Sequence, residues 1–168
     1  MGRKARQHRE DLTGEHKWGD VGQIILICLF LTTWIVDCFF LKYTTFLNKY
    51  IPIGFKISSG IILFVLSGYL VRKGHSIVFG EERQEPGVIR KSVFRVVRHP
   101  IYLSEILFYL GFLVMIPSLA AAVVWVITIG FLHYISRHEE RLLLARYGEE
   151  YRQYMQEVPM WVPLPWRK

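Results

Sequence analysis

Residues 21–41 read VGQIILICLFLTTWIVDCFFL, and this stretch decides the class of the protein. It holds 21 residues with Asp37 as its only charge, and about 20 apolar helical residues cross the hydrocarbon core of a bilayer. We therefore expect a transmembrane helix here. The run is long and is not followed by a small-residue cleavage site, so we expect it to remain in the mature protein.

Three further apolar runs follow the first. Ile53–Val71 has only Lys56 as a charge, and Ile101–Ile116 is separated from Ser118–Ser136 by Pro117 alone, which predicts a tight helical hairpin. The third run has 16 residues, or about 24 Å of helix, which is short enough to reach only part of the way across. The sequence thus predicts an all-α fold, a multi-pass membrane bundle of about four transmembrane helices.

The positive charges indicate how the chain is oriented. The 168 residues carry 21 Lys and Arg against 14 Asp and Glu, a formal charge of +7 that in a soluble protein could suggest nucleic acid. Here 5 positive residues lie in 1–20, 7 in 72–98 and 6 in 137–168, against 3 in 42–56. With four crossings, 18 face one side and 3 the other, which predicts cytoplasmic N- and C-termini and no nucleic-acid partner.

The same segregation divides the chain into three parts. We expect a basic cytoplasmic N-terminal segment at 1–20, two transmembrane helices within 21–71, and a catalytic region at 72–168. The last part would comprise a cytoplasmic loop, the helical hairpin 101–136, and a cytoplasmic C-terminal helix and tail.

Few other polar residues interrupt the spans. Cys28 and Cys38 lie about 15 Å apart along one helix, beyond the reach of a disulfide, and are expected to serve packing. Asp37 lies close to the far end of its span, so we expect it in the outer headgroup region without a catalytic role. Cys/His metal spacing and glycine-rich phosphate loops are absent from the sequence, so no metal is expected.

Chemistry is most plausible where the basic loop enters the third span, at 96–102, which reads VVRHPIY. Proline favours the first position of a helix and disfavours helix before it, so Pro100 predicts a sharp helix start at the membrane surface. Arg98 and His99 then lie beside free backbone N–H groups, an arrangement that suits an anionic group of a ligand. The alternative is that Arg98 binds lipid phosphate and His99 only caps the interface.

A second candidate segment, 138–151, follows the fourth span. Its apolar residues recur at helical spacing, which predicts that the helix continues out of the membrane with one apolar face and that Gly148 interrupts it. Glu139 and Glu140 lie near the membrane boundary, where carboxylates need a cation or a hydrogen bond. The hairpin returns them to Arg98–His99, which predicts a polar pocket; the alternative is a structural Arg–Glu pair.

Two further features have both a functional and a structural interpretation. Glu105 shares a helical face with His99 and Tyr102, and an acid within a span is a functional candidate by default, here for a substrate or cofactor contact. The stretch 158–166 alternates three prolines with large apolar residues, which excludes a regular helix. Its tryptophans favour the membrane interface, where it could be a lid over a lipid entrance or a simple anchor.

At these two segments the sequence resembles the isoprenylcysteine carboxyl methyltransferase and phospholipid methyltransferase superfamily of integral membrane enzymes. The resemblance covers roughly residues 60–165. It rests on Arg98-His99-Pro100-Ile101-Tyr102, followed by Glu139-Glu140, Leu143, Tyr147-Gly148-Glu149-Glu150-Tyr151, Tyr154 and Val158-Pro159.

The resemblance implies an S-adenosylmethionine-dependent methyltransferase whose cofactor lies at the cytoplasmic face, while a lipidic or hydrophobic acceptor arrives from the bilayer. By the same resemblance, Glu139 would hold a cofactor amine or hydroxyl. The other implied cofactor contacts are Pro86, Gly87, Val88, Ile89, Phe94, His99, Pro100, Ile101 and Tyr102. The candidate catalytic residues are Arg98, Glu105, Arg137 and Glu140.

Departures from the family pattern bear on the acceptor. Carboxyl-methylating members carry an Arg four residues before the first Glu, where this chain has Ile135. Arg137, two residues further on, is the alternative at this position, but it lies about 200° further round the helix. The prediction of a prenylcysteine carboxylate is therefore weakened. The Gly-Pro-Tyr-like turn of the family is also altered here, to Ser92-Val93-Phe94.

The residues themselves fit a methyl donor of this kind, but two other functions stay open. S-adenosylmethionine has an adenine for aromatic stacking, a carboxylate for basic groups, and cationic groups that prefer acids and ring faces. Sterol-reductase-like membrane proteins resemble the same superfamily and would use NADPH instead. A non-catalytic scaffold whose basic face binds anionic lipid is the third hypothesis.

Overall fold

The computed structural model describes residues 19–79 and 87–162, and within them the chain is all helical, as the sequence predicts. The α-helices are α2 (Gly19–Ile35), α3 (Ile53–Phe79), α4 (Pro100–Met115), α5 (Leu119–Tyr147) and α6 (Glu149–Glu157). Shorter helical segments are the π-helix η1 (Val36–Leu41) and the 3-10 helices η2 (Phe46–Lys49) and η3 (Ser92–Arg95).

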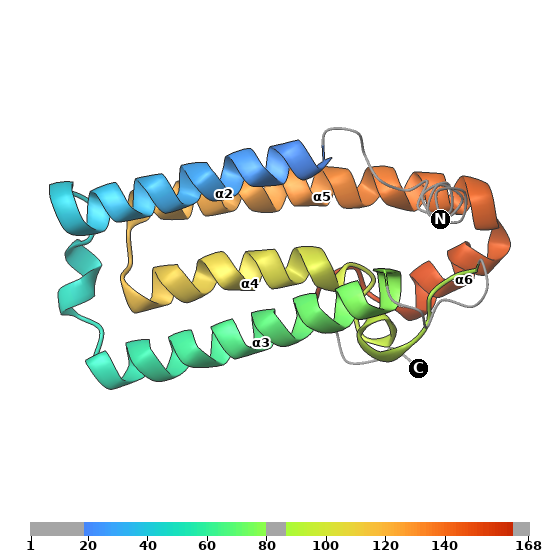
Figure 1. The fold of residues 1–168 in the computed structure, drawn as a ribbon, viewed down its shortest axis with the longest axis horizontal. Helices are drawn as coiled ribbons and strands as arrows, with labels where there is room; N and C mark the ends of the chain where they lie inside the picture. The colour runs from blue at the N-terminus through green and yellow to red at the C-terminus, as the bar shows by residue number, and fades with distance from the viewer. Residues whose placement is uncertain (1–18, 80–86, 163–168) are drawn as a thin grey trace, which may run out of the picture.

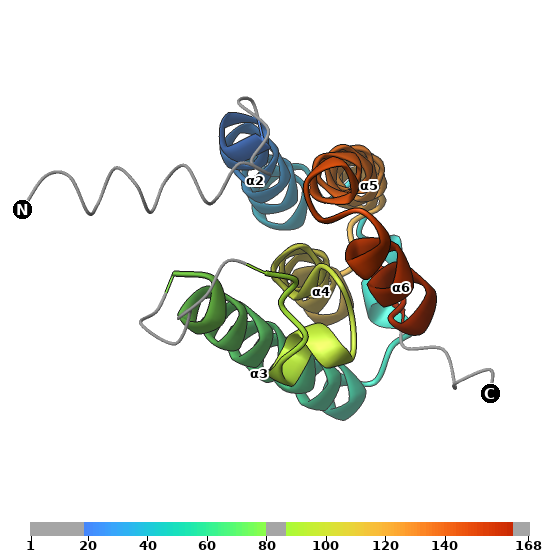
Figure 2. The ribbon, with the colours of Figure 1, turned by 90° about the vertical axis from the view of Figure 1, so that its right-hand side faces the viewer.

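The four long helices run side by side in two layers. Figure 1 shows α2 beside α5 in one layer and α3 beside α4 in the other, and α4 packs most extensively against α3. The turn between α4 and α5 lies at the same end as the loop 42–52. In the end-on view of Figure 2, α6 turns back beside α4 and α5 at the opposite end; we call this the α6 end.

Three helical segments in the described residues are long and apolar enough to cross a membrane, namely Gly19–Leu41, Ile53–Val78 and Leu119–Tyr147. Their outer faces expose large apolar side chains, for example Ile24 at 61%, Ile62 at 65% and Val123 at 61%. Such extensive apolar surface is lipid-facing, and the protein is an integral membrane protein. The 16-residue α4 is apolar but shorter, so the count of four crossings stays a prediction.

Aromatic side chains join the two layers in the middle of the bundle. Phe30 of α2 is fully buried and stacks on Tyr109 of α4, with ring centroids 4.4 Å apart and planes 7° from parallel. Phe112 packs edge-on against both Phe30 and Trp34. The Trp34 indole N–H donates to the carbonyl of Ile116 at 3.0 Å, which ties α2 to the end of α4.

The helix boundaries follow from particular residues. α4 begins at Pro100 and ends at Met115, and Ser118 caps the N-terminus of α5 by accepting a hydrogen bond from the backbone N–H of Ala121 at 3.1 Å. The tight hairpin is therefore confirmed. α5 continues far beyond the apolar run and stops where Gly148 adopts a φ of +54°, a conformation that glycine reaches without steric cost.

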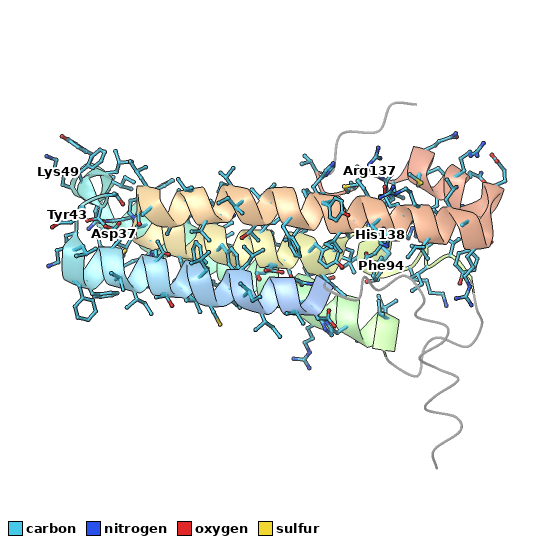
Figure 3. The ribbon with its side chains drawn as sticks, turned by 90° about the horizontal axis from the view of Figure 1, so that it is seen from above. Asp37, Tyr43, Lys49, Phe94, Arg137 and His138 are labelled. Carbon is cyan, nitrogen blue, oxygen red and sulfur yellow. The ribbon has the colours of Figure 1, made fainter. Side chains whose placement is uncertain are left out.

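Asp37 lies buried at the end of the bundle away from α6 (Figure 3). Its carboxylate accepts hydrogen bonds from the Thr44 backbone N–H at 3.1 Å, the Thr44 hydroxyl and the Ser118 hydroxyl at 2.6 Å. The loop after the span and the α4–α5 turn fold back over the carboxylate. Asp37 therefore fastens three segments together.

Replacing Asp37 should destabilise the fold. In Asp37→Ala the Thr44 and Ser118 donors lose a charged acceptor, and one hydrogen bond to a charged group contributes about 1.5–3 kcal/mol. We expect a loss of stability of at least that size in thermal unfolding of the detergent-purified protein. Asp20→Ala, at an exposed position in the first turn of α2, is the matched control; equal stability of the two variants would contradict this account of Asp37.

Candidate functional site

The candidate site is built where three segments meet at the α6 end. The backbone N–H groups of Arg98 and His99 donate to the carbonyls of Pro159 at 2.9 Å and Met160 at 3.2 Å. The stretch after α6 is therefore fastened across the start of α4. Pro100 sits at the first position of α4 and is buried, so the helix begins abruptly beneath this strap, which we define as residues 158–161.

A buried ion pair joins the start of α4 to the end of α5. Arg98 Nε donates to Glu140 Oε1 at 2.8 Å, and the Glu140 side chain is 2% exposed. Arg98 Nη1 also donates to the carbonyls of Met155 and Val158, each at 2.7 Å. Most of the hydrogen-bonding capacity of the guanidinium is thus directed to fixed partners, which argues against its binding lipid phosphate.

His99 lies between the two glutamates of α5. Its Nε2 is 3.2 Å from Glu140 Oε1, and its Nδ1 is 3.6 Å from Glu139 Oε2. The ring is parallel to that of Tyr102 within 10°, with centroids 5.7 Å apart, and the Tyr102 hydroxyl donates to Glu139 Oε1. The structure therefore brings together the Arg-His-Pro and Glu-Glu segments, as the hairpin predicts.

Burial controls the charge of His99. Its pKa is lowered because the surrounding protein penalises the charged ring, an effect that outweighs the opposing influence of Glu140. A neutral imidazole has one N–H donor and one acceptor nitrogen, so the two glutamates cannot both receive a hydrogen bond from it. His99 is thus a neutral ring, held in a fixed orientation beside the Glu139 carboxylate.

Other predicted cofactor contacts have packing roles in this structure. Val88 packs against the buried cluster of Tyr151, Tyr154 and Val158. Ile89 and Phe94 pack against the cluster of Leu70, Ile77 and Val93. These contacts pack residues 88–94 against α3, α6 and the strap.

The remaining predicted contacts lie close to α3 or outside the described residues. Ile101 sits so close to α3 that a Cβ on Gly74 would lie 2.7 Å from its Cγ1, so glycine is required for this approach. Gly87 has open space around its Cα. Pro86 lies outside the described residues.

Glu105 is separate from the ion pair. It lies six residues beyond His99, about 9 Å further along α4, and accepts a hydrogen bond from the Tyr109 hydroxyl at 2.8 Å. Because Tyr109 belongs to the central aromatic cluster, Glu105 marks a polar position between the site and the apolar core.

Arg137 and Ile135 lie in different environments on α5. Ile135 is 1% exposed and packs inside the bundle, whereas the Arg137 side chain is 60% exposed. Figure 3 shows Arg137 on the α6 side of α5 and Phe94 and His138 on the other side. Arg137 Nη1 instead lies 3.8 Å from Glu140 Oε2, the carboxylate oxygen that faces away from Arg98.

Sequence reasoning missed the backbone acceptors of the site. The carbonyls of Met155, Val158, Pro159 and Met160 are fixed partners of Arg98 and His99, and backbone atoms carry no sequence signature. The available signal was the proline-rich stretch, whose prolines exclude a helix and so leave carbonyls available to other donors. Trp161 of this strap packs edge-on against His133, with centroids 5.6 Å apart.

Comparison with known proteins supports a membrane enzyme family. A family model described as 3-oxo-5-alpha-steroid 4-dehydrogenase matches residues 20–164, which is most of the chain. The chain belongs to this family. The same family includes isoprenylcysteine methyltransferases, so the resemblance to the integral membrane methyltransferase superfamily is confirmed.

Two curated relatives are named as methyltransferases. Methanethiol S-methyltransferase 1 of Bradyrhizobium diazoefficiens is 38% identical over 92 residues, or 53% of this chain and 30% of the relative. Protein-S-isoprenylcysteine O-methyltransferase of Schizosaccharomyces pombe is 22% identical over 144 residues, or 83% of this chain and 58% of the relative. The chain therefore matches less than two thirds of either relative within the family. No solved structure matches it.

Removing the buried carboxylate should unfold this end of the protein. Glu140→Ala leaves Arg98 buried without its counter-ion, and breaking a buried ion pair costs about 3–5 kcal/mol. Thermal unfolding in detergent measures the loss. Glu149→Ala is the matched control because that side chain is 79% exposed in its pairing with Arg152; a Glu140 variant as stable as this control would show that the pair is dispensable.

The lowered pKa of His99 predicts a pH dependence of stability. An unfolded chain takes up a proton near the ordinary pKa of 6.5, whereas the buried ring resists it, so stability is full above this pH and is lost as the pH falls below it. The stability should therefore fall between pH 7.5 and pH 5.5. His99→Gln should lose less stability than the parent between pH 7.5 and 5.5; an equal loss would assign the dependence to other groups.

Proposed function

We propose that this protein is an S-adenosylmethionine-dependent methyltransferase that acts on a lipidic or otherwise hydrophobic acceptor. The observation that carries the proposal is the contact of buried His99 and Glu140 with half-buried Tyr102 and Glu139 at one end of a membrane bundle. It occurs in a family that includes methyltransferases, and both curated relatives carry methyltransferase names. The excess of positive residues favours a cytoplasmic location for this end and for both termini.

The residues present fit the proposed cofactor. Ser136 is fully buried one turn before Glu140, and its hydroxyl has no hydrogen-bond partner among the described residues, so it can serve a polar ligand group. Glu139 would hold a hydroxyl or an ammonium of the cofactor, and the parallel His99 and Tyr102 rings offer aromatic surface. When bound, S-adenosylmethionine supplies an electrophilic methyl group on a sulfonium. The protein would orient donor and acceptor and exclude water.

The acceptor is proposed to be one that does not rely on a carboxylate–arginine contact. Buried Ile135 stands at the position of the family arginine, and Arg137 points to another side of α5. Glu105 is proposed as the acceptor contact because it is the acid of the apolar hairpin. Methylation of a protic acceptor such as a thiol would form a new carbon–sulfur bond, break the bond between the methyl group and the sulfonium of the donor, and leave S-adenosylhomocysteine. The acceptor would lose a proton, which a carboxylate at this position could accept.

A second candidate function is a reductase that uses NADPH. The family model that matches the chain is described as a 3-oxo-5-alpha-steroid 4-dehydrogenase, and a nicotinamide cofactor would also need aromatic surface and polar partners. The two functions differ in the cofactor that stabilises the folded protein, because a ligand that binds only the native state raises its stability.

Cofactor binding is the direct test. S-adenosylmethionine or S-adenosylhomocysteine at millimolar concentration should raise the melting temperature of the purified protein, whereas NADPH should not. Glu139→Gln should weaken the apparent affinity about tenfold, which corresponds to the loss of one charge-assisted contact. Glu149→Gln, exposed on α6, should respond like the parent.

Two outcomes would overturn different parts of the proposal. Stabilisation by NADPH without any response to S-adenosylmethionine would replace the methyltransferase with the reductase. A Glu139 variant that responds like the parent would leave the function standing and show that the assigned site is wrong.

A further inference from the structure

A cavity lies in the elbow between α5 and α6. It has a volume of about 430 Å³ and is lined by Arg137, Glu140, Arg141, Leu144 and Met155. The four α5 residues recur at offsets of three, four and seven, so they form one face of the helix. Arg137 of this face lies on the α6 side (Figure 3). Glu139, which meets Tyr102, lies about 200° further round the helix from Arg137.

Two guanidinium groups line this cavity, and both are exposed enough to receive a ligand. Arg137 and Arg141 are one helical turn apart, and the Arg137 side chain is 60% exposed. Guanidinium groups match the oxygen geometry of phosphate and bind it with paired, charge-assisted hydrogen bonds. The arginine pair therefore predicts an anionic ligand, most suitably a phosphate ester.

A buried carboxylate oxygen in the cavity requires a hydrogen-bond donor on the ligand. Glu140 Oε1 is held by Arg98 and His99, but Glu140 Oε2 is buried and accepts no hydrogen bond within residues 19–79 and 87–162. The Arg137 guanidinium lies 3.8 Å from it, beyond hydrogen-bond distance. A buried carboxylate oxygen gains most from a donor, so a matching ligand carries an N–H or O–H group near its phosphate.

The location of the cavity identifies the source of such a ligand. Arg137 immediately follows the apolar run of α5 that ends at Ser136, where the helix leaves the hydrocarbon and phospholipid phosphates lie. Leu144 and Met155 provide apolar wall beside the two arginines. A phospholipid headgroup supplies a phosphate to the two arginines at this depth, because the lipid is anchored in the membrane.

We propose that the α5–α6 elbow is a binding site for a phospholipid headgroup that combines a phosphodiester with a hydrogen-bond donor. The phosphate is held by Arg137 and Arg141, and the donor is received by Glu140 Oε2. Phosphatidylethanolamine and phosphatidylglycerol carry such a donor, and phosphatidylcholine carries none. The site shares Glu140 with the proposed active site but uses its Oε2, whereas Arg98 and His99 hold Oε1. Lipid binding here does not require that the protein transfers methyl groups.

Native mass spectrometry of the full chain, released from detergent micelles doped with one lipid at a time, tests the site. The parent should retain phosphatidylethanolamine and phosphatidylglycerol at least about tenfold more than phosphatidylcholine, as one charge-assisted hydrogen bond implies. The double variant Arg137→Ala/Arg141→Ala should lose this retention. Arg152→Ala, an exposed arginine of α6 outside the cavity, is the matched control and should bind like the parent.

Further arms separate the parts of the proposal. Equal retention of phosphatidylcholine would overturn the role of Glu140, and unchanged retention by the double arginine variant would overturn the site. Displacement of the lipid by millimolar soluble phosphoethanolamine would support the headgroup chemistry and admit a free phosphate ester as ligand. If the parent keeps its lipid in the presence of soluble phosphoethanolamine and only the double variant loses it, the result would support a membrane lipid as the ligand. Unchanged melting of the double variant excludes misfolding as the cause.

Discussion

The buried ion pair of Arg98 and Glu140 is the contact on which the α6 end of the protein depends. The two residues are 42 positions apart and belong to different segments, so the pair determines how the start of α4 meets the end of α5. Burying either charge alone would cost several kcal/mol, and the carbonyls of Met155 and Val158 complete the solvation of the guanidinium. Glu140 of this pair also contacts His99 and so orients the ring, and the neighbouring Glu139 is held beside Tyr102.

Polar contacts fasten both ends of the bundle, while aromatic packing fills the middle. At one end Asp37 joins η1, the following loop and the α4–α5 turn. At the other end Glu140 joins the start of α4 to α5, and Arg98 extends this contact to the strap. Helices in lipid gain little from further apolar contact with one another, because lipid tails are as apolar as their side chains. Directional contacts at the two ends can therefore fix the register that apolar packing alone leaves loose.

Much of this architecture could be predicted from local sequence patterns. Pro100, Pro117 and Gly148 mark helix boundaries through backbone constraints that act within a few residues, and the hairpin then brings Arg98 and Glu140 together. The burial of Asp37 could not be predicted from its span, because it depends on a loop that folds back from outside the span. The role of the backbone carbonyls was missed because any residue could supply them. Which side of α5 Arg137 faces also needed the position of α6.

We propose above all that a methyl donor binds beside Tyr102 and Glu139 at the α6 end. Ultraviolet cross-linking of S-adenosylmethionine labelled in its methyl group, followed by peptide mapping of the full chain in detergent, locates the donor directly. The account predicts label in the peptides that contain residues 99–102 or 136–140, abolished by excess S-adenosylhomocysteine and not by NADPH. Label confined to the opposite end, in the loop 42–52, or label that S-adenosylhomocysteine does not displace, would contradict it.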